Sequence, residues 1–381
     1  MSSADTGQRR LPYQPALDGL RAVAVAGVLL FHAFAASGHP GWFRGGNLGV
    51  SVFFTLSGYL ITSLLLAEGH ATGRVRLGRF WTRRIRRLVP AATAVVAGVL
   101  VLDRLGLLTT RASDVVASLW SVTNWHIIRG GDDDLLATVL GPFGPTWSLA
   151  VEEQAYVVLA LLAWLACRLN RLRLILATGA VASVVLSLAT AWSAGGWSPR
   201  LEFGTDARAA EIAIGVLLAV ALERSPNVLE RFHRPVAVIG SVAGAVLLVL
   251  FLVADYSPPW LLRGGFVGVA CCSAAVIAAS LVDTPVRRLL SRRPLVKVGT
   301  ASYSLYLVHW PVYLVLDGER TGAGGTALVA IRLVAAAAAA TVLHLAVEQP
   351  LRTTTASSRT VVITWIASAA ALSAVALTAL A

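Results

Sequence analysis

DGLRAVAVAGVLLFHAFAA, residues 18–36, is the stretch that decides the fold, because it is long and apolar enough to cross a bilayer as a helix. It carries two ionisable side chains, Arg21 and His32. The α-helix between them advances about 16 Å and makes three turns plus about 20°, so both side chains lie on one face. Ionisable groups are costly in hydrocarbon, and such a pair therefore indicates a functional site. The alternative is structural: an arginine that reaches the membrane surface and a packed histidine.

The rest of the chain has the same apolar character. Of its 381 residues, 56% are hydrophobic and only 14% are charged, and the mean hydropathy is +0.72. Repeated apolar runs of about 20 residues predict an all-α polytopic membrane protein. We expect residues 1–381 to form a single integral membrane domain, with a short basic cytoplasmic N-terminus (1–17) and no soluble C-terminal domain.

Eleven spans are predicted, and basic residues set their orientation. The expected spans are 18–36, 47–67, 88–105, 146–166, 173–192, 206–222, 235–253, 264–281, 299–316, 325–346 and 361–381. With the N-terminus inside, the inner segments carry 22 Lys and Arg residues and the outer segments carry eight. Positive charge collects on the cytoplasmic side, so we predict a cytoplasmic N-terminus. Membrane topology therefore explains the net charge of +12, and the charge does not indicate nucleic-acid binding.

The fourth span begins TWSLAVEEQAYVV and offers a carboxylate at the depth of His32. Ser148, Glu152 and Tyr156 are four residues apart and share one stripe of the helix, whereas Glu153 points about 100° away. A carboxylate and an imidazole at one depth can work as an acid–base pair. The alternative is a structural ion pair between two helices.

On the inner side, RFWTRRIRRLVP (residues 79–90) opens the third span. Arg84 and Arg87 lie on one helical face, and guanidinium groups bind phosphate in a bidentate manner. Topology alone can also account for this basic cluster. Ser57 and Gly58 lie in the centre of the second span, where a glycine indicates either close helix packing or room for a thin ligand.

Further ionisable residues lie in the sixth and ninth spans. Asp206, Arg208 and Glu211 are expected near the outer mouth, where they recognise a polar acceptor or pair with one another. His309 lies near mid-membrane in SYSLYLVHWPV and is interpreted as a second functional histidine, the alternative being a satisfied core residue. The three cysteines form neither a disulfide framework nor a metal site.

Together these features predict an inner phosphate-binding mouth, an apolar shaft and an outer imidazole with a carboxylate. Such a geometry suits acyl-coenzyme A, with its phosphorylated head and long thin arm. His32 is the predicted general base and Glu152 its partner, while Arg21, Arg84, Arg87 and Ser57 bind the donor. Since no cysteine or serine nucleophile is evident, direct transfer to an acceptor hydroxyl is favoured. No metal and no tightly bound cofactor are expected, and the expected co-substrate is acyl-CoA in the form of acetyl-CoA.

The sequence resembles the bacterial membrane O-acyltransferases of acyltransferase family 3. The matching motifs, in chain order, are LDGLRAVAVAGVLLFH, GVSVFFTLSGYLIT, RRIRRLVPA, WSLAVEEQAYVV, TDARAAEIAIG, SYSLYLVHWPV and EQPLR. The resemblance implies acyl-CoA-dependent acylation of a hydroxyl on a sugar, surface glycan, lipid or secondary metabolite, at the inner or plasma membrane. It implies functional roles for Arg21, His32, Arg84, Arg87 and Glu152. It lends support to Trp147, Ser148, Tyr156, Asp206, Arg208 and His309.

Two departures from the family pattern and two rival functions remain. Many relatives carry a C-terminal extracytoplasmic hydrolase-like domain, whereas this chain ends with its last span. Relatives often have an aromatic residue before the histidine of the ninth span, where this chain has Val308. An exporter or flippase of a glycan or lipid would also have intramembrane charges, and a non-catalytic sensor or scaffold could share the fold.

Overall fold

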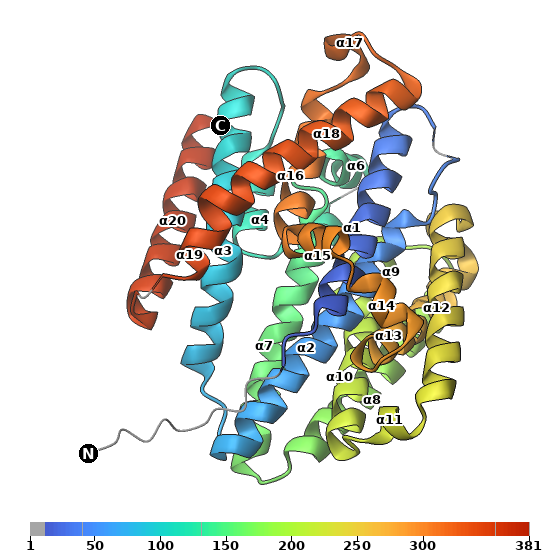
Figure 1. Cartoon of the computed structure of the whole chain (residues 1–381). Coiled ribbons are helices and arrows are strands. Elements are labelled where there is room, and N and C mark those ends of the chain that lie inside the picture. The colour runs from blue at the N-terminus through green and yellow to red at the C-terminus, as the bar shows by residue number, and fades with distance from the viewer. Residues whose placement is uncertain (1–11, 40, 131, 355, 381) are drawn as a thin grey trace.

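The computed structural model describes residues 12–39, 41–130, 132–354 and 356–380, and in these ranges the regular structure is helical throughout, with no strand. Figure 1 shows long helices running side by side. Nine helices of the described part are long and apolar enough to cross a membrane. They are α1 (Pro15–Ala36), α2 (Gly49–Thr72), α3 (Leu77–Arg104), α7 (Thr146–Arg168), α8 (Leu172–Ser193), α12 (His233–Val253), α13 (Phe266–Leu281), α18 (Gly325–Leu343) and α20 (Ser358–Ala379).

These nine helices confirm the predicted all-α polytopic membrane fold, and they coincide with nine of the eleven predicted spans. The other two predicted spans are also helical. The helix α10 (Thr205–Arg224) carries Asp206, Arg208 and Glu211 in its first two turns. These charges exclude it from the nine helices whose composition is apolar enough to cross a membrane. The helix α16 (Ser302–Val315) has 14 residues and is about 21 Å long, short of a hydrocarbon core of about 30 Å. Most of the predicted basic N-terminus, residues 1–11, lies outside the described residues.

Short helices connect the long ones. They are η1 (Gly46–Leu48), α4 (Ala112–Leu119), α5 (Thr123–Arg129), α6 (Asp132–Leu140), α9 (Pro199–Phe203), α11 (Val228–Arg231), η2 (Leu261–Gly265), α14 (Pro285–Leu290), α15 (Arg293–Thr300), α17 (Gly318–Thr321), η3 (His344–Glu348) and α19 (Gln349–Arg352). The segment 106–145, which lies between the predicted third and fourth spans, contains α4, α5 and α6.

Helices α2 and α10 pack backbone against backbone. A Cβ atom on Gly58 would lie 2.0 Å from the carbonyl oxygen of Ile212, and one on Gly215 would lie 2.0 Å from that of Thr55. Only glycine permits this approach. Of the two interpretations of Gly58, the structure supports close helix packing, while the neighbouring Ser57 faces a cavity.

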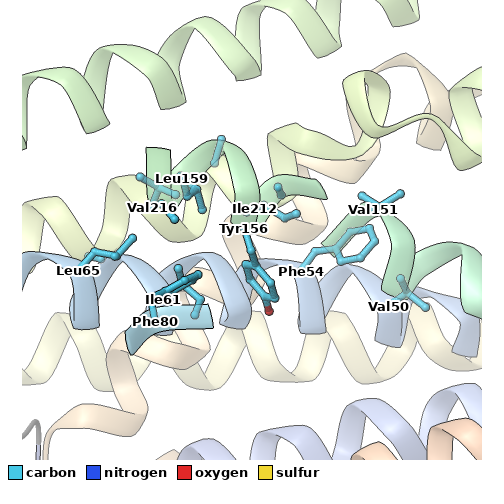
Figure 2. Close-up of a cluster of buried hydrophobic side chains, with 14 of the residues drawn as sticks. Val50, Phe54, Ile61, Leu65, Phe80, Val151, Tyr156, Leu159, Ile212 and Val216 are labelled. Carbon is cyan, nitrogen blue, oxygen red and sulfur yellow. The ribbon is translucent and has the colours of Figure 1, made fainter. Parts of the chain in front are cut away.

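The largest apolar core joins α2, α7 and α10. Figure 2 shows Phe54 and Ile61 of α2 beside Tyr156 of α7, with Val216 of α10 on the opposite side of Tyr156 from its hydroxyl group. This packing fixes the face that α7 turns toward α2. On the other side of α2, α1 also contacts α16, and α20 lies at the edge of the bundle against α3 and α4 (Figure 1).

Candidate active site

A cavity of about 1430 Å³ lies among α1, α2, α3, α7 and α16. Its lining includes Tyr13 and six arginines: Arg21, Arg83, Arg84, Arg86, Arg87 and Arg352. It also reaches Phe54, Ser148 and Tyr306. All four residues predicted to bind the donor, namely Arg21, Ser57, Arg84 and Arg87, line this one cavity. Their convergence from three helices is the arrangement that the sequence predicted.

The arginines at the mouth differ in their partners. Arg21 donates to the carboxylate of Asp18 over 2.6 Å, and Tyr13 donates to the same carboxylate over 2.7 Å. The guanidinium of Arg84 instead lies over the ring of Tyr156, 3.8 Å from its centroid. Within the described ranges, Arg84 and Arg87 make no hydrogen bond or ion pair with protein groups. Their positive charge is therefore available to a ligand.

The neighbouring arginines of α3 are engaged elsewhere. Arg83 pairs with Glu68 at 3.8 Å, and Arg86 donates to the carbonyl oxygen of Ala356. Arg352, which the sequence analysis quoted in a motif but gave no role, also lines the cavity, and it has no hydrogen-bonding partner in the described part of the chain. Arg84, Arg87 and Arg352 thus form no ion pair in the described part of the chain, although the Glu153 carboxylate on the same cavity wall interacts electrostatically with Arg84 and Arg87. The positive charge that remains would suit an anion.

Glu152 lies on the cavity wall between α7 and α2. Its carboxylate accepts hydrogen bonds from the hydroxyl groups of Ser57 and Tyr156. Ser148, Glu152 and Tyr156 all line the cavity, as their shared stripe predicts. However, the direct pairing of Glu152 with His32 does not occur among the described residues, because each side chain has other partners. Matched depth fixes the height of two residues in the bilayer but not which helices face each other.

His32 pairs with His309. Its Nδ1 lies 3.1 Å from Nε2 of His309, and the Nδ1 of His309 lies 2.6 Å from the carbonyl oxygen of Tyr306. A carbonyl oxygen only accepts, so Nδ1 of a neutral His309 carries the proton and its Nε2 accepts one. It follows that the Nδ1–H of His32 is the donor. The Nε2 of His32 then keeps its lone pair, which is the state that a general base requires.

The cavity ends at Tyr306, one ring from the histidines. The Tyr306 hydroxyl lies 2.7 Å from the Ser148 hydroxyl and 2.8 Å from the carbonyl oxygen of Pro145. Its ring centroid is 5.5 Å from that of His309. The cavity lining includes neither His32 nor His309. The predicted continuous passage from the arginines to His32 is therefore not present in this structure: the cavity reaches Tyr306, whose ring contacts His309, and does not reach His32.

The outer charged cluster forms ion pairs of its own. Arg208 is buried and lies 2.7 Å from the carboxylate of Glu211 and 3.7 Å from that of Glu202. Asp206 pairs with Arg200 at 2.5 Å instead. Of the three predicted residues, Arg208 and Glu211 therefore pair with each other, whereas Asp206 pairs outside the set. Glu202 was missed by the sequence analysis, and burial raises its pKa.

Trp147 belongs to the packing around this cluster. Its ring lies edge-on to Phe203 at 5.2 Å and to Phe54 at 6.2 Å, and the guanidinium of Arg208 lies 5.4 Å from its centroid. The opposite face of the cation is covered by Phe266 at 3.7 Å. These aromatic rings shield the buried charges from the lipid.

The fold and the site together define a multi-pass membrane protein with an arginine-lined cavity next to a buried histidine pair. The chain belongs to acyltransferase family 3, because residues 14–344 match that family's acyltransferase domain.

The chain is also similar to named proteins of Staphylococcus aureus. It is 33% identical to O-acetyltransferase OatA of strain NCTC 8325 over 317 residues, which are 80% of this chain and 51% of that protein. It is 34% identical over 319 residues to SAS0844 of strain MSSA476, named provisionally as an O-acetyltransferase, with 81% and 52% of the two chains covered. The chain spans about half the length of these curated relatives. No solved structure matches it.

Proposed function

We propose that this protein is an O-acyltransferase of the inner or plasma membrane that moves an acetyl group from cytoplasmic acetyl-CoA to a hydroxyl of a glycan, lipid or small molecule. The names of the O-acetyltransferase relatives support the reaction class and the acetyl group. The observation that carries the donor assignment is the pair Arg84 and Arg87, which line the cavity and make no hydrogen bond or ion pair with protein groups in the described ranges. No nucleic-acid partner and no metal enter this proposal.

The donor occupies the cavity with its nucleotide at the arginines. Phosphate groups bind guanidinium through charge-assisted hydrogen bonds, which Arg84, Arg87 and Arg352 have free donors to make. Ligand pockets commonly enclose about 300–1,000 Å³, and a cavity of about 1430 Å³ suits a ligand as large as a coenzyme A thioester. The pantetheine arm then extends past Ser57 and Glu152 toward Tyr306.

Acyl transfer takes place where the arm meets the histidine pair. The Nε2 of His32 removes the proton of the acceptor hydroxyl as its oxygen attacks the thioester carbonyl carbon. The carbon–sulfur bond breaks, and the departing coenzyme A thiolate takes the proton from the imidazolium. His309 acts as the positioning residue that holds the tautomer of His32. Glu152 holds Ser57 and Tyr156, and through the Tyr156 ring it keeps Arg84 in the cavity.

This mechanism requires Tyr306 to turn aside while the thioester reacts. The His32 side chain is only partly buried in the structure, and the acceptor approaches it through this exposed part.

The catalytic proposal is tested with purified protein in proteoliposomes, radiolabelled acetyl-CoA and extracted cell-envelope glycans. His32→Ala should abolish label transfer while acetyl-CoA binding is retained, because His32 does not line the donor cavity. Undiminished transfer by this variant would overturn the assignment of the base. Glycan movement across the bilayer without acetyl-CoA consumption would favour the exporter instead.

The donor site is tested with two arginine variants on one helix. Arg87→Gln should raise the KM for acetyl-CoA about 10–100-fold, since hydrogen bonds to charged groups contribute about 1.5–3 kcal/mol each. Arg79→Gln is the matched control, because Arg79 is an exposed residue of α3 that does not line the cavity. Equal effects of the two substitutions would point to general surface charge and contradict the donor site.

A further inference from the structure

A second cavity, of about 790 Å³, lies on the outer flank of the donor cavity between α3, α7, α16 and α20. We call it the α20 groove. Most of its lining is apolar, with Ile85, Val89, Ala92 and Val96 along α3, Leu307 on α16 and Ile363 on α20. None of these side chains takes part in the proposed acyl transfer.

The helix α20 forms one wall of this groove. It follows the family-matched region, which ends at residue 344. It packs mainly on α3 and α4, at the edge of the bundle (Figure 1), and most of its surface is exposed. Because α3 and α20 are both apolar enough to cross a membrane, the groove between them is predicted to lie within the hydrocarbon layer.

The polar end of the groove is basic. Arg84 and Arg359 both line it, and Arg359 has no ion-pair partner in the described ranges. Arg84 also lines the donor cavity. The groove and the cavity meet at five shared residues: Arg84, Leu88, Leu149, Glu153 and Tyr303. From Arg84 to Val96 the helix rises about 18 Å. One leaflet of the hydrocarbon core is about 15 Å thick, so the groove has the length of one lipid chain.

We propose that the α20 groove binds an anionic phospholipid of the inner leaflet. The lipid's hydrocarbon chain lies along α3 beneath α20, and its phosphate lies between Arg359 and Arg84. The predicted orientation places Arg359 on the cytoplasmic side, where anionic lipids concentrate and attract basic residues. This site is separate from the catalytic proposal. Its phosphate nonetheless shares Arg84 with the donor, so bound lipid and bound donor influence each other.

The experiment reconstitutes the full chain in vesicles that contain a photoreactive phosphatidylglycerol with a diazirine in one acyl chain. A matched set uses the zwitterionic phosphatidylcholine analogue. After illumination, the labelled peptides are mapped by mass spectrometry. We expect phosphatidylglycerol to label residues 85–96 and 358–365 several-fold more than the exposed faces of α8 and α12. Even labelling of all these helices would overturn the proposal.

Substitutions in the groove test the binding of the lipid's acyl chain and of its headgroup separately. Ala92→Phe fills the groove and should reduce its labelling several-fold. Gly98→Phe on the same helix, where an added Cβ meets no atom within 4 Å, should not. Arg359→Gln should keep the chain bound but abolish the preference for phosphatidylglycerol over phosphatidylcholine.

Competition identifies the occupant. Excess unlabelled phosphatidylglycerol should suppress the labelling, whereas palmitoyl-CoA should weaken it no more than acetyl-CoA does, because both thioesters share only Arg84 with the lipid. Suppression by palmitoyl-CoA alone would make the groove a site for the donor's acyl chain and would overturn the lipid proposal. Because photolabelling needs no turnover, it should persist in His32→Ala. Failure of the lipid site is therefore distinct from failure of the acyltransferase proposal.

Discussion

Replacing His309 by phenylalanine tests whether His309 holds His32 in the tautomer that acts as the base. The substitution keeps an aromatic ring in a fully buried position but removes both ring nitrogens. The Nδ1–H of His32 then loses the acceptor that lies 3.1 Å away. The carbonyl oxygen of Val28, one turn back on α1, is the other acceptor near this group.

The size of the effect follows from that lost hydrogen bond. A buried donor left without a partner costs about 1–3 kcal/mol. Because Val28 can satisfy part of this demand, we take the lower half of the range, about 1.4 kcal/mol. Each 1.36 kcal/mol corresponds to about tenfold in rate. His309→Phe should therefore lower kcat for acetyl transfer about tenfold.

The assay follows label from radiolabelled acetyl-CoA to extracted envelope glycans in proteoliposomes. The KM for acetyl-CoA should stay unchanged, since neither histidine lines the donor cavity. His309→Gln should recover part of the lost activity, because its side-chain oxygen can accept the hydrogen bond from His32. If His309→Phe retained the wild-type kcat, or if its KM rose in parallel with the loss of kcat, the positioning role would be wrong.

Three further substitutions test the surrounding structure. Tyr306→Phe removes the hydroxyl contacts with Ser148 and Pro145, each worth about 1 kcal/mol. The ring should then turn aside more often, and the release of coenzyme A in the absence of an acceptor should rise several-fold. An unchanged rate of release would contradict the role of Tyr306 in closing the cavity. Gly58→Ala places a Cβ 2.0 Å from a carbonyl oxygen of α10 and should destabilise the protein by about 1–3 kcal/mol in thermal unfolding. Burial raises the pKa of Glu202, so stability should fall as pH rises through its folded-state pKa, and Glu202→Gln should flatten that profile of Tm against pH.

Helical periodicity predicted which side chains of α3 and α7 face the same cavity. Arg84 and Arg87 share a face because three residues separate them by one helical turn, and Ser148, Glu152 and Tyr156 share a stripe for the same reason. Such relations are local, so they survive whatever the rest of the chain does. The structure places all five residues on one cavity.

Pairing between helices was not predictable in the same way. The depth of His32 was derived from its position in α1, but its partner depends on which helix packs against that face. The structure puts α16 there, so His309 and not Glu152 contacts His32. Glu202 escaped notice because the five-residue helix α9 offers no periodicity to interpret. For the spans, α10 was too polar and α16 too short for composition to decide whether they cross the membrane.

The separation of the arginines from the histidines by a single side chain has a chemical consequence. If the passage were permanently open, water from either side could reach both the thioester and the base, and the donor would be hydrolysed without benefit. Tyr306 is held by two hydrogen bonds, which together contribute about 2 kcal/mol to keeping its ring in place. An acceptor that displaces the ring would supply this energy through its own contacts. The passage would then open only when an acceptor hydroxyl is present to receive the acyl group. On this reasoning the interruption of the cavity is a requirement of the chemistry and not an obstacle to it.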